Sequence, residues 1–169
     1  MADPQSAASA GATDASGDPN LVHFSIERVY VKDLSLENPG SPQAFQLTEP
    51  PQVEVGLRTR TDRLQPDVYE SVLTVTVTAR TGDRTIFLVE AAQAGIFTIR
   101  GVPEDRLQPV MAIHCPTVLF PYVRETIASA TSRAGYPPVH LAPINFEALY
   151  TQQLAQVQQA QPAVAGSVN

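Results

Sequence analysis

The fold is constrained most by two segments in which apolar and polar residues alternate. They are VYESVLTVTVTAR and RTIFLVEAAQAGIFTIRG, and a short turn separates them. In the first segment leucine, valine and alanine alternate with threonine, and a period of two is typical of a β-strand with one buried face. The connection TGD contains Gly82, and strands joined by a few such residues predict an antiparallel hairpin. The small residues AAQAG in the second segment predict a bulge or a site of close backbone approach.

Two more strands are predicted before this hairpin. Residues 22–37 form a long strand, with one face made by Phe24, Ile26, Tyr30, Leu34 and Leu36. The opposite face is made by Ser25, Glu27, Asp33, Ser35 and Glu37. Residues 52–61 form the other strand, and its apolar face carries Val53, Val55 and Leu57. The intervening stretch NPGSPQAFQLTEPP is rich in proline, so we expect an irregular loop anchored by Phe45 and Leu47.

The period of the apolar residues changes to about 3.6 after Gly101, which predicts helices. Pro103 and the two acidic residues after it indicate a first helical turn that Pro109 shortens or kinks. The main helix ends at Gly135, and its apolar face is made by Leu119, Val123, Ile127, Ala130 and Ala134. Asn145 is the expected N-cap of a last helix. Strands followed by helices predict an α+β fold with an antiparallel sheet.

One domain is expected between residues 21 and 160 of the 169-residue chain. Residues 1–20 are small and polar, so we expect a disordered N-terminal tail, and we expect residues 161–169 to be a flexible C-terminal tail. The first residues lack the basic and apolar regions of a secretory signal. No apolar run approaches the roughly 20 residues of a membrane span, so we expect a cytoplasmic protein without stable membrane insertion.

The net charge of −6 and the single cysteine argue against several classes of function. Lys32 is the only lysine among 11 basic residues, and no basic stripe is present to neutralise phosphates, so nucleic acid is not an expected partner. Cys115 alone cannot form an internal disulfide framework or a thiolate zinc site. The 3 histidines fall on different predicted elements without metal-ligand spacing, so no metal site is expected.

Asp33 and Glu37 are the carboxylates that most suggest a catalytic or metal-binding pair. A strand rises about 3.3 Å per residue, so their α-carbons lie roughly 13 Å apart, too far for a shared proton. They are either an ordinary solvated strand face or a surface offered to a partner. No phosphate-binding loop and no G-x-S-x-G motif are found in the sequence, so an enzyme is not expected, although catalytic groups converging from distant positions remain open.

The apolar residues Val53, Val55 and Leu57 also have two interpretations. Beside the proline-rich loop with Phe45, they could line a groove for an extended or disordered chain. Alternatively, they face the predicted helices as part of the core. The alternation alone does not separate these two interpretations.

Four stretches of the chain occur together, in the same order, in one known family. They are FSIERVYVKDLSLENPGSPQAF, VYESVLTVTVTA with FLVEAAQAGIF, HCPTVLFPYVRETI, and PPVHLAPINFEALY. Together they resemble the SecB export chaperones of Gram-negative bacteria, and the likeness runs from about Phe24 to Tyr150. Four ordered motifs are far more specific than any single short pattern.

The resemblance implies a four-stranded antiparallel sheet followed by two main helices, in a homotetramer assembled as a dimer of dimers. It implies an ATP-independent chaperone without a cofactor that binds unfolded precursor proteins, keeps them translocation-competent and delivers them to the SecA ATPase for export through the Sec translocon. The residues implied to dock SecA are Asp33, Glu37, Leu88 and Glu90. Those implied to line the client groove are Phe45, Val53, Val55 and Leu57. The alternative is a SecB-like holdase for a non-export client such as a toxin.

Overall fold

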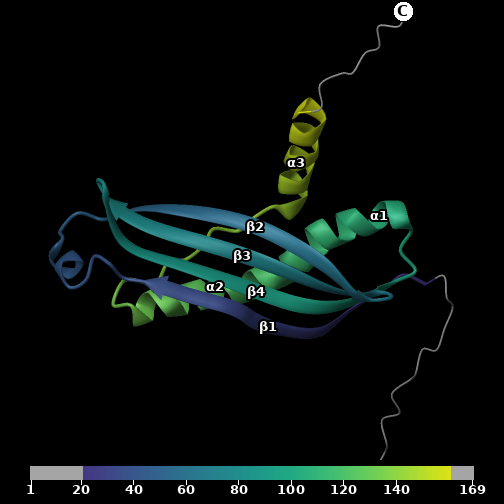
Figure 1. Ribbon diagram of the computed structural model, residues 1–169, viewed down its shortest axis with the longest axis horizontal. Coiled ribbons are helices and arrows are strands. Elements are labelled where there is room, and N and C mark those ends of the chain that lie inside the picture. The colour runs from purple at the N-terminus through teal and green to yellow at the C-terminus, as the bar shows by residue number, and fades with distance from the viewer. Residues whose placement is uncertain (1–20, 161–169) are drawn as a thin grey trace, which may run out of the picture.

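Four antiparallel strands form a single sheet in the computed structural model, which describes residues 21–160 (Figure 1). The strands are β1 (His23–Glu37), β2 (Gln52–Gln65), β3 (Val68–Thr81) and β4 (Arg84–Arg100). Their order in the sheet is β1-β4-β3-β2, so the β3–β4 hairpin is central and β1 and β2 are the edges. The predicted α+β class, the antiparallel sheet and the hairpin are confirmed. The predicted tails, residues 1–20 and 161–169, lie outside the described residues.

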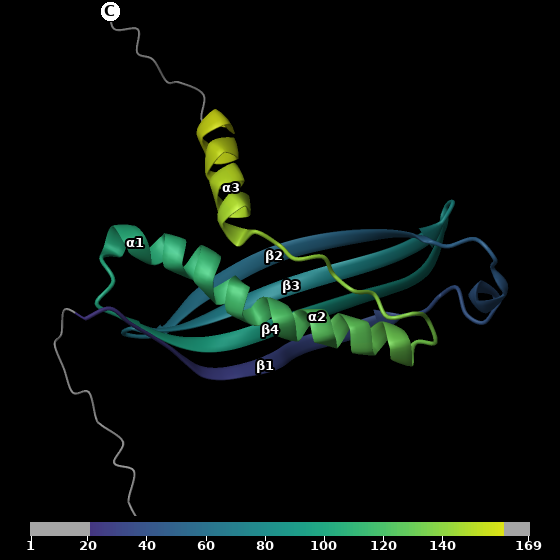
Figure 2. The ribbon, with the colours of Figure 1, turned by 180° about the vertical axis from the view of Figure 1, so that it is seen from behind.

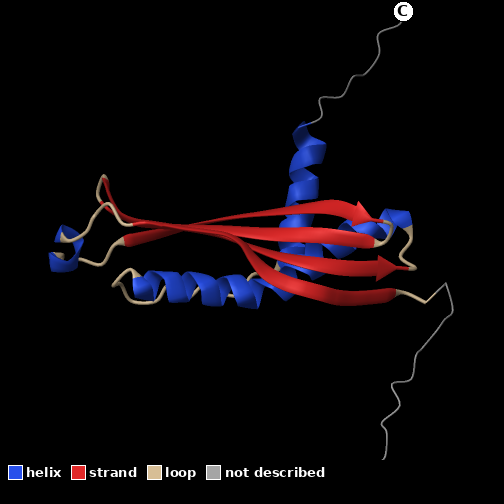
Figure 3. Cartoon of the chain, turned by 60° about the horizontal axis from the view of Figure 1, so that its bottom comes forward, coloured by secondary structure: helices blue, strands red, loops and turns tan. Residues whose placement is uncertain are grey.

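The helices follow the sheet in the chain, and α2 lies on one of its faces (Figure 2, Figure 3). A continuous helical run contains α1 (Glu104–Pro109), a π-helical turn (Val110–His114) and α2 (Cys115–Arg133). The last helix, α3 (Phe146–Ala160), extends away from the sheet beside β2 (Figure 2). We call the sheet face under α2 the helix face and the opposite one the open face.

The core lies between α2 and the helix face of the central hairpin. Alternate residues of β3, from Leu73 to Ala79, are 0% exposed and pack with apolar residues of α2. The predicted helical face is confirmed, because Leu119, Val123 and Ile127 are fully buried in this core. The helix ends where predicted, with Gly135 at a φ of 91°, a left-handed conformation that favours glycine.

The expected close approach in AAQAG occurs at Gly95. A Cβ atom added there would lie 2.7 Å from the ring of Phe97 and 3.0 Å from a methyl carbon of Leu119 on α2. β4 itself pairs with β3 in unbroken register from Phe87 to Thr98. The small residue therefore lets α2 approach the sheet closely.

The predicted faces of β1 are wrong at Tyr30. Two register shifts against β4, between Ile26 and Arg28 and between Val31 and Asp33, each insert one extra residue. A bulge of this kind reverses the face of every residue between the shifts. Tyr30 therefore lies on the open face, where its hydroxyl donates a hydrogen bond to Glu70. After the second shift Asp33 lies on the open face as well.

The kink expected near Pro109 takes the form of the π-helical turn. Pro109 is the last residue of α1, and the five residues after it have i→i+5 geometry before α2 begins at Cys115. The predicted cap of α3 is also confirmed, because the side-chain oxygen of Asn145 accepts a hydrogen bond from the backbone of Ala148 at 3.0 Å.

Candidate functional site

The register of the sheet arranges open-face side chains in rows that cross all four strands. One row contains Glu37, Leu88, Thr78 and Glu54, from β1 to β2. The next row, two residues further along, contains Ser35, Glu90, Thr76 and Gly56. The third contains Asp33, Ala92, Thr74 and Arg58. Directly paired residues share a face, so these rows follow from the pairing alone.

The structure brings Asp33, Glu37, Leu88 and Glu90 to the open face of two neighbouring strands. Glu37 is paired with Leu88, and Asp33 lies one row beyond Glu90. Asp33 and Glu37 are exposed, whereas Leu88 and Glu90 are half-buried. The four residues form one surface that combines an apolar side chain with three carboxylates, which we call the acidic patch.

Glu90 is held in place by two side chains from other strands. Thr76 on β3 donates a hydrogen bond to its Oε2 at 2.7 Å. Arg58 on β2 lies 3.4 Å from its Oε1, and this ion pair is exposed on the arginine side. The carboxylate is therefore fixed in position on the open face, where a partner can reach it.

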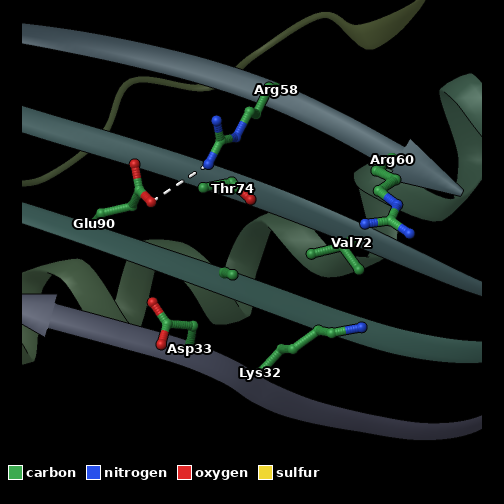
Figure 4. A pocket seen from close by; sticks show the side chains of 8 residues that line it. Lys32, Asp33, Arg58, Arg60, Val72, Thr74 and Glu90 are labelled. Atoms are coloured by element: carbon green, nitrogen blue, oxygen red, sulfur yellow. Dashed lines mark hydrogen bonds and ion pairs between the residues drawn. The ribbon is translucent and has the colours of Figure 1, made fainter.

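An open depression of about 480 Å³ lies on the open face beside the acidic patch. Its charged lining is made by Lys32, Asp33, Arg58, Arg60 and Glu90. In Figure 4 these side chains stand in front of the strands, and a helix lies behind the sheet. The depression therefore has three cationic and two anionic side chains.

Glu70 anchors a polar network at one side of this depression. Lys32 Nζ lies 2.6 Å from one carboxylate oxygen of Glu70, and the Tyr30 hydroxyl donates to the other. These bonds from Lys32 and Tyr30 lower the pKa of Glu70, although burial opposes the shift. The carboxylate of Glu70 raises the pKa of Tyr30 to about 12. At neutral pH the network holds one buried negative charge against the Lys32 ammonium.

The residues expected to line a client groove lie on the helix face. Val53, Val55 and Leu57 pair with Ala79, Val77 and Val75 of the core hairpin. Leu57 is half-buried and packs against the core, whereas Val53 is 45% and Val55 is 51% exposed. Leu57 thus joins the core, whereas the two valines form an exposed apolar edge, and their part in a client groove stays a prediction.

Phe45, in the loop before β2, lies at the end of the helix face that carries Val53. Its ring lies 5.2 Å from that of Tyr136, whose ring lies 4.7 Å from that of Phe87 on β4. Phe87 shares a row with Val53, through Ala79. Phe45 is 51% exposed, so aromatic and aliphatic surface is available at this end of the sheet.

Sequence reasoning missed the role of the basic residues around the depression. The alternation of β2 indicates that Arg58 and Arg60 share a face, but it does not show which strand lies beside them. Their proximity to Glu90 on β4 depends on β3 alone lying between β2 and β4. The bulge that brings Lys32 to Glu70 has no evident sequence signal.

Residues 21–160 also contain histidine, carboxylate and cysteine side chains that could ligate a metal ion or react. No group of three or more metal-binding side chains is found within this range. Nor does any helix within it have the length and apolar character required to cross a membrane. Cys115 is fully buried, and its burial raises the thiol pKa to about 12, which keeps the thiol protonated at neutral pH.

The two surfaces of the sheet, one charged and one apolar, suit the binding of other polypeptides. The family model described as preprotein translocase subunit SecB matches residues 17–157. The chain belongs to the SecB family, whose members are protein-export chaperones.

Curated relatives agree with the family model. The chain is 53% identical over 150 residues to the protein-export protein SecB of Burkholderia lata, an alignment that covers 89% of this chain and 94% of the relative. The same identity and coverage are found for the protein-export protein SecB of Burkholderia multivorans. The family model's match to residues 17–157 spans the sheet, α1, α2 and most of α3.

A solved structure of a SecB-like chaperone from Mycobacterium tuberculosis, in complex with a peptide from an antitoxin, has a similar fold. Its TM-score is 0.61 at 15% sequence identity, over 72% of this chain and 90% of that chain. At this identity the similarity concerns the fold alone.

Proposed function

We propose that this protein is an ATP-independent cytoplasmic chaperone that holds unfolded precursor proteins and delivers them to the SecA motor for export through the Sec translocon. The observation that carries the proposal is the arrangement of the sheet. Its open face presents the acidic patch, and its helix face presents the exposed apolar edge with Val53 and Val55. One surface would dock the motor while the other holds the client, and neither step requires a cofactor.

The apolar edge suits a client that is unfolded. Burial of apolar surface contributes about 25 cal/mol per Å², and this contribution depends on area rather than on a particular sequence. An extended chain can lay alternate side chains along Val53, Val55 and Phe45. Many weak contacts of this kind compete with the marginal stability of a client's native state, which is typically about 5–15 kcal/mol.

The acidic patch suits a basic docking surface on the motor. Charged groups at the rim of an interface mainly increase the rate of association and its specificity, whereas Leu88 supplies apolar contact at the centre. The resulting affinity should fall as salt concentration rises. Docking is therefore expected to be reversible, as delivery requires.

We also propose that the working form is a homotetramer, a dimer of dimers. The edge strand β1 leaves four exposed apolar side chains on the helix face, Ile26, Val31, Leu34 and Leu36. An exposed edge strand with an apolar face is a template for pairing with another chain. Light scattering should give four times the mass of one chain, and a monomeric mass over the working concentration range would contradict the assembly.

A binding assay on immobilised SecA tests the docking assignment. The double variant Asp33→Ala with Glu90→Ala should lose binding, because it removes two carboxylates of the acidic patch. The matched control, Glu104→Ala with Asp105→Ala, removes the same two residue types from exposed positions of α1 and should bind normally. Unchanged binding by the first variant would show that the assignment is wrong.

A second candidate is a holdase of the same fold that serves a non-export client such as a toxin. The likeness in fold to the mycobacterial SecB-like chaperone, which was solved with an antitoxin peptide, favours keeping this candidate. The two candidates differ in one measurable respect. The export chaperone must bind SecA, whereas the alternative holdase requires no such interaction.

A further inference from the structure

We propose that the depression on the open face takes an extended segment of the docking partner that carries both signs of charge. A lysine or arginine of this segment lies over Glu90 and Asp33, and a carboxylate a few residues away lies between Arg58 and Arg60. The inference rests on the proposed docking function of the open face. It adds the charge pattern that the docking segment must have.

The charges of the depression are divided in space. Two acidic side chains, Asp33 and Glu90, lie at one end of the depression (Figure 4). The pairing of β1 with β4 places Glu37 further along the strands in the same direction. Arg60 and Lys32 lie at the other end, and Arg58 lies between the two groups (Figure 4). A segment with lysines alone would pair with the acidic end of the depression, but it would place positive charge against the basic end. A segment with both signs complements the whole depression.

Both arginines can accept a new partner at little cost. Arg58 is 74% exposed and lies 3.4 Å from Glu90, and Arg60 is 76% exposed and lies 2.8 Å from Asp62. Exposed ion pairs of this kind contribute only about 0–1 kcal/mol, so an incoming carboxylate can replace them. A guanidinium has five N–H donors, and each of these two has a single carboxylate partner among residues 21–160.

Release of Arg58 does not leave Glu90 without support. Glu90 keeps the 2.7 Å hydrogen bond from Thr76, which fixes its carboxylate on the open face. A basic side chain of the partner then takes the position that Arg58 leaves. The exchange converts one ion pair within the chain into two ion pairs across the interface.

Lys32 has a different part in the depression. Its ammonium lies 2.6 Å from Glu70, whose side chain is only 10% exposed, so this ion pair is much less accessible than those of the arginines. Lys32 and Glu70 together contribute almost no net charge. The binding of a carboxylate is therefore assigned to Arg58 and Arg60.

The register gives the spacing of the charges in the docking segment. Glu90, Arg58 and Arg60 lie in three successive rows, and successive rows are about 6.7 Å apart along the strands. Side chains of an extended chain alternate between two faces, so only residues two or four positions from the basic residue face the sheet with it, about 6.7 Å and about 13 Å away, at the rows of Arg58 and Arg60. The segment should therefore carry an acidic residue two or four positions from a basic one.

Two synthetic peptides of ten residues test this pattern without the motor. Both carry two lysines at alternate positions, and two and four positions after the second lysine one carries glutamates where the other carries glutamines; each is made in both sequence directions. Isothermal titration with the intact protein should show that the glutamate peptide, in one direction, binds about three- to tenfold more tightly, the range expected for one or two rim ion pairs. Equal or tighter binding of the glutamine peptide, or no measurable binding of either, would overturn the inference.

Variants of the protein assign the preference to the arginines. Arg58→Gln with Arg60→Gln should abolish the difference between the two peptides and weaken SecA binding. Arg106→Gln with Arg133→Gln removes two exposed arginines from the helices and should leave the preference intact. A preference that persists in the first variant, or SecA binding that becomes tighter, would show that Arg58 only masks Glu90.

The two proposals fail in different ways. If SecA binds through the acidic patch but the peptides are not distinguished, the charge pattern is wrong and the docking assignment stands. If the peptides are distinguished but SecA does not bind, the depression binds segments of both charges and the motor is not the partner.

Discussion

Leu88 on β4 is paired directly with Glu37 on β1, and both side chains project from the sheet face that the helices leave open. Leu88 is half-buried, so its exposed part is an apolar contact flanked by carboxylates. An apolar centre surrounded by charged and polar residues is the usual arrangement of a protein interface. Two residues separated by fifty positions in the chain therefore form one element of the acidic patch.

Leu88→Ala should weaken SecA binding by about tenfold, because burial of part of a leucine side chain contributes about 1–2 kcal/mol. Surface plasmon resonance at fixed salt concentration measures the change. Leu36→Ala is the matched control, since Leu36 lies one position from Glu37 but on the helix face. An equal loss in both variants would argue against docking through the open face.

Val53→Thr with Val55→Thr should reduce the capture of a denatured precursor while the fold is kept. Threonine has the shape and strand preference of valine but replaces a methyl group by a hydroxyl. Capture is measured as suppression of light scattering when the precursor is diluted from denaturant. Val22→Thr, at an exposed residue just before β1, should leave capture unchanged. Full capture by the double variant would show that the two valines do not belong to the client groove.

Gly95→Ala should destabilise the protein by about 1–3 kcal/mol, the usual cost of overpacking a core. The added methyl group would lie 2.7 Å from the Phe97 ring. Gly56→Ala is the control on β2, where the nearest atoms to an added Cβ are 3.9 Å away. Urea denaturation at matched protein concentration compares the two variants. Equal stability would mean that α2 moves away from β4 easily.

Glu70→Gln should lower the free energy of unfolding by about 1–3 kcal/mol at pH 7, the range for hydrogen bonds to a charged group. The pKa of Glu70 is lower in the folded protein than its ordinary value of 4.5. The stabilisation is therefore complete above pH 4.5 and is lost as the pH falls through the folded pKa. Urea denaturation at pH 7 and at pH 4 or below should show a smaller difference between variant and wild type in acid. A difference that stays constant or grows in acid would contradict the network.

The elements of the fold could be predicted from the sequence because their patterns are local. Alternation identified the strands, and the spacing of Leu119, Val123 and Ile127 identified the buried face of α2. The N-cap at Asn145 has a well-known residue preference. Each of these features depends on residues that lie close together in the chain.

The face of Tyr30 could not be predicted, since one bulge reverses the faces before it and a second restores them after it. Nothing in the local sequence marks the shifts on either side of Tyr30, which depend on pairing with β4. The composition of the depression was missed for a similar reason. Arg58 and Glu90 come from strands that are not neighbours, so their contact follows only from the order of the strands.

The most direct test of the account is the delivery of a precursor to the export machinery. An unfolded precursor is mixed with the protein and added to inverted inner-membrane vesicles that contain the translocon, SecA and ATP. We predict that protease-protected precursor increases over the amount without the chaperone. Asp33→Ala with Glu90→Ala should still hold the precursor soluble but lose this increase. If the wild-type protein gives no more protected precursor than buffer does, or if the variant delivers as well as wild type, the central claim is wrong.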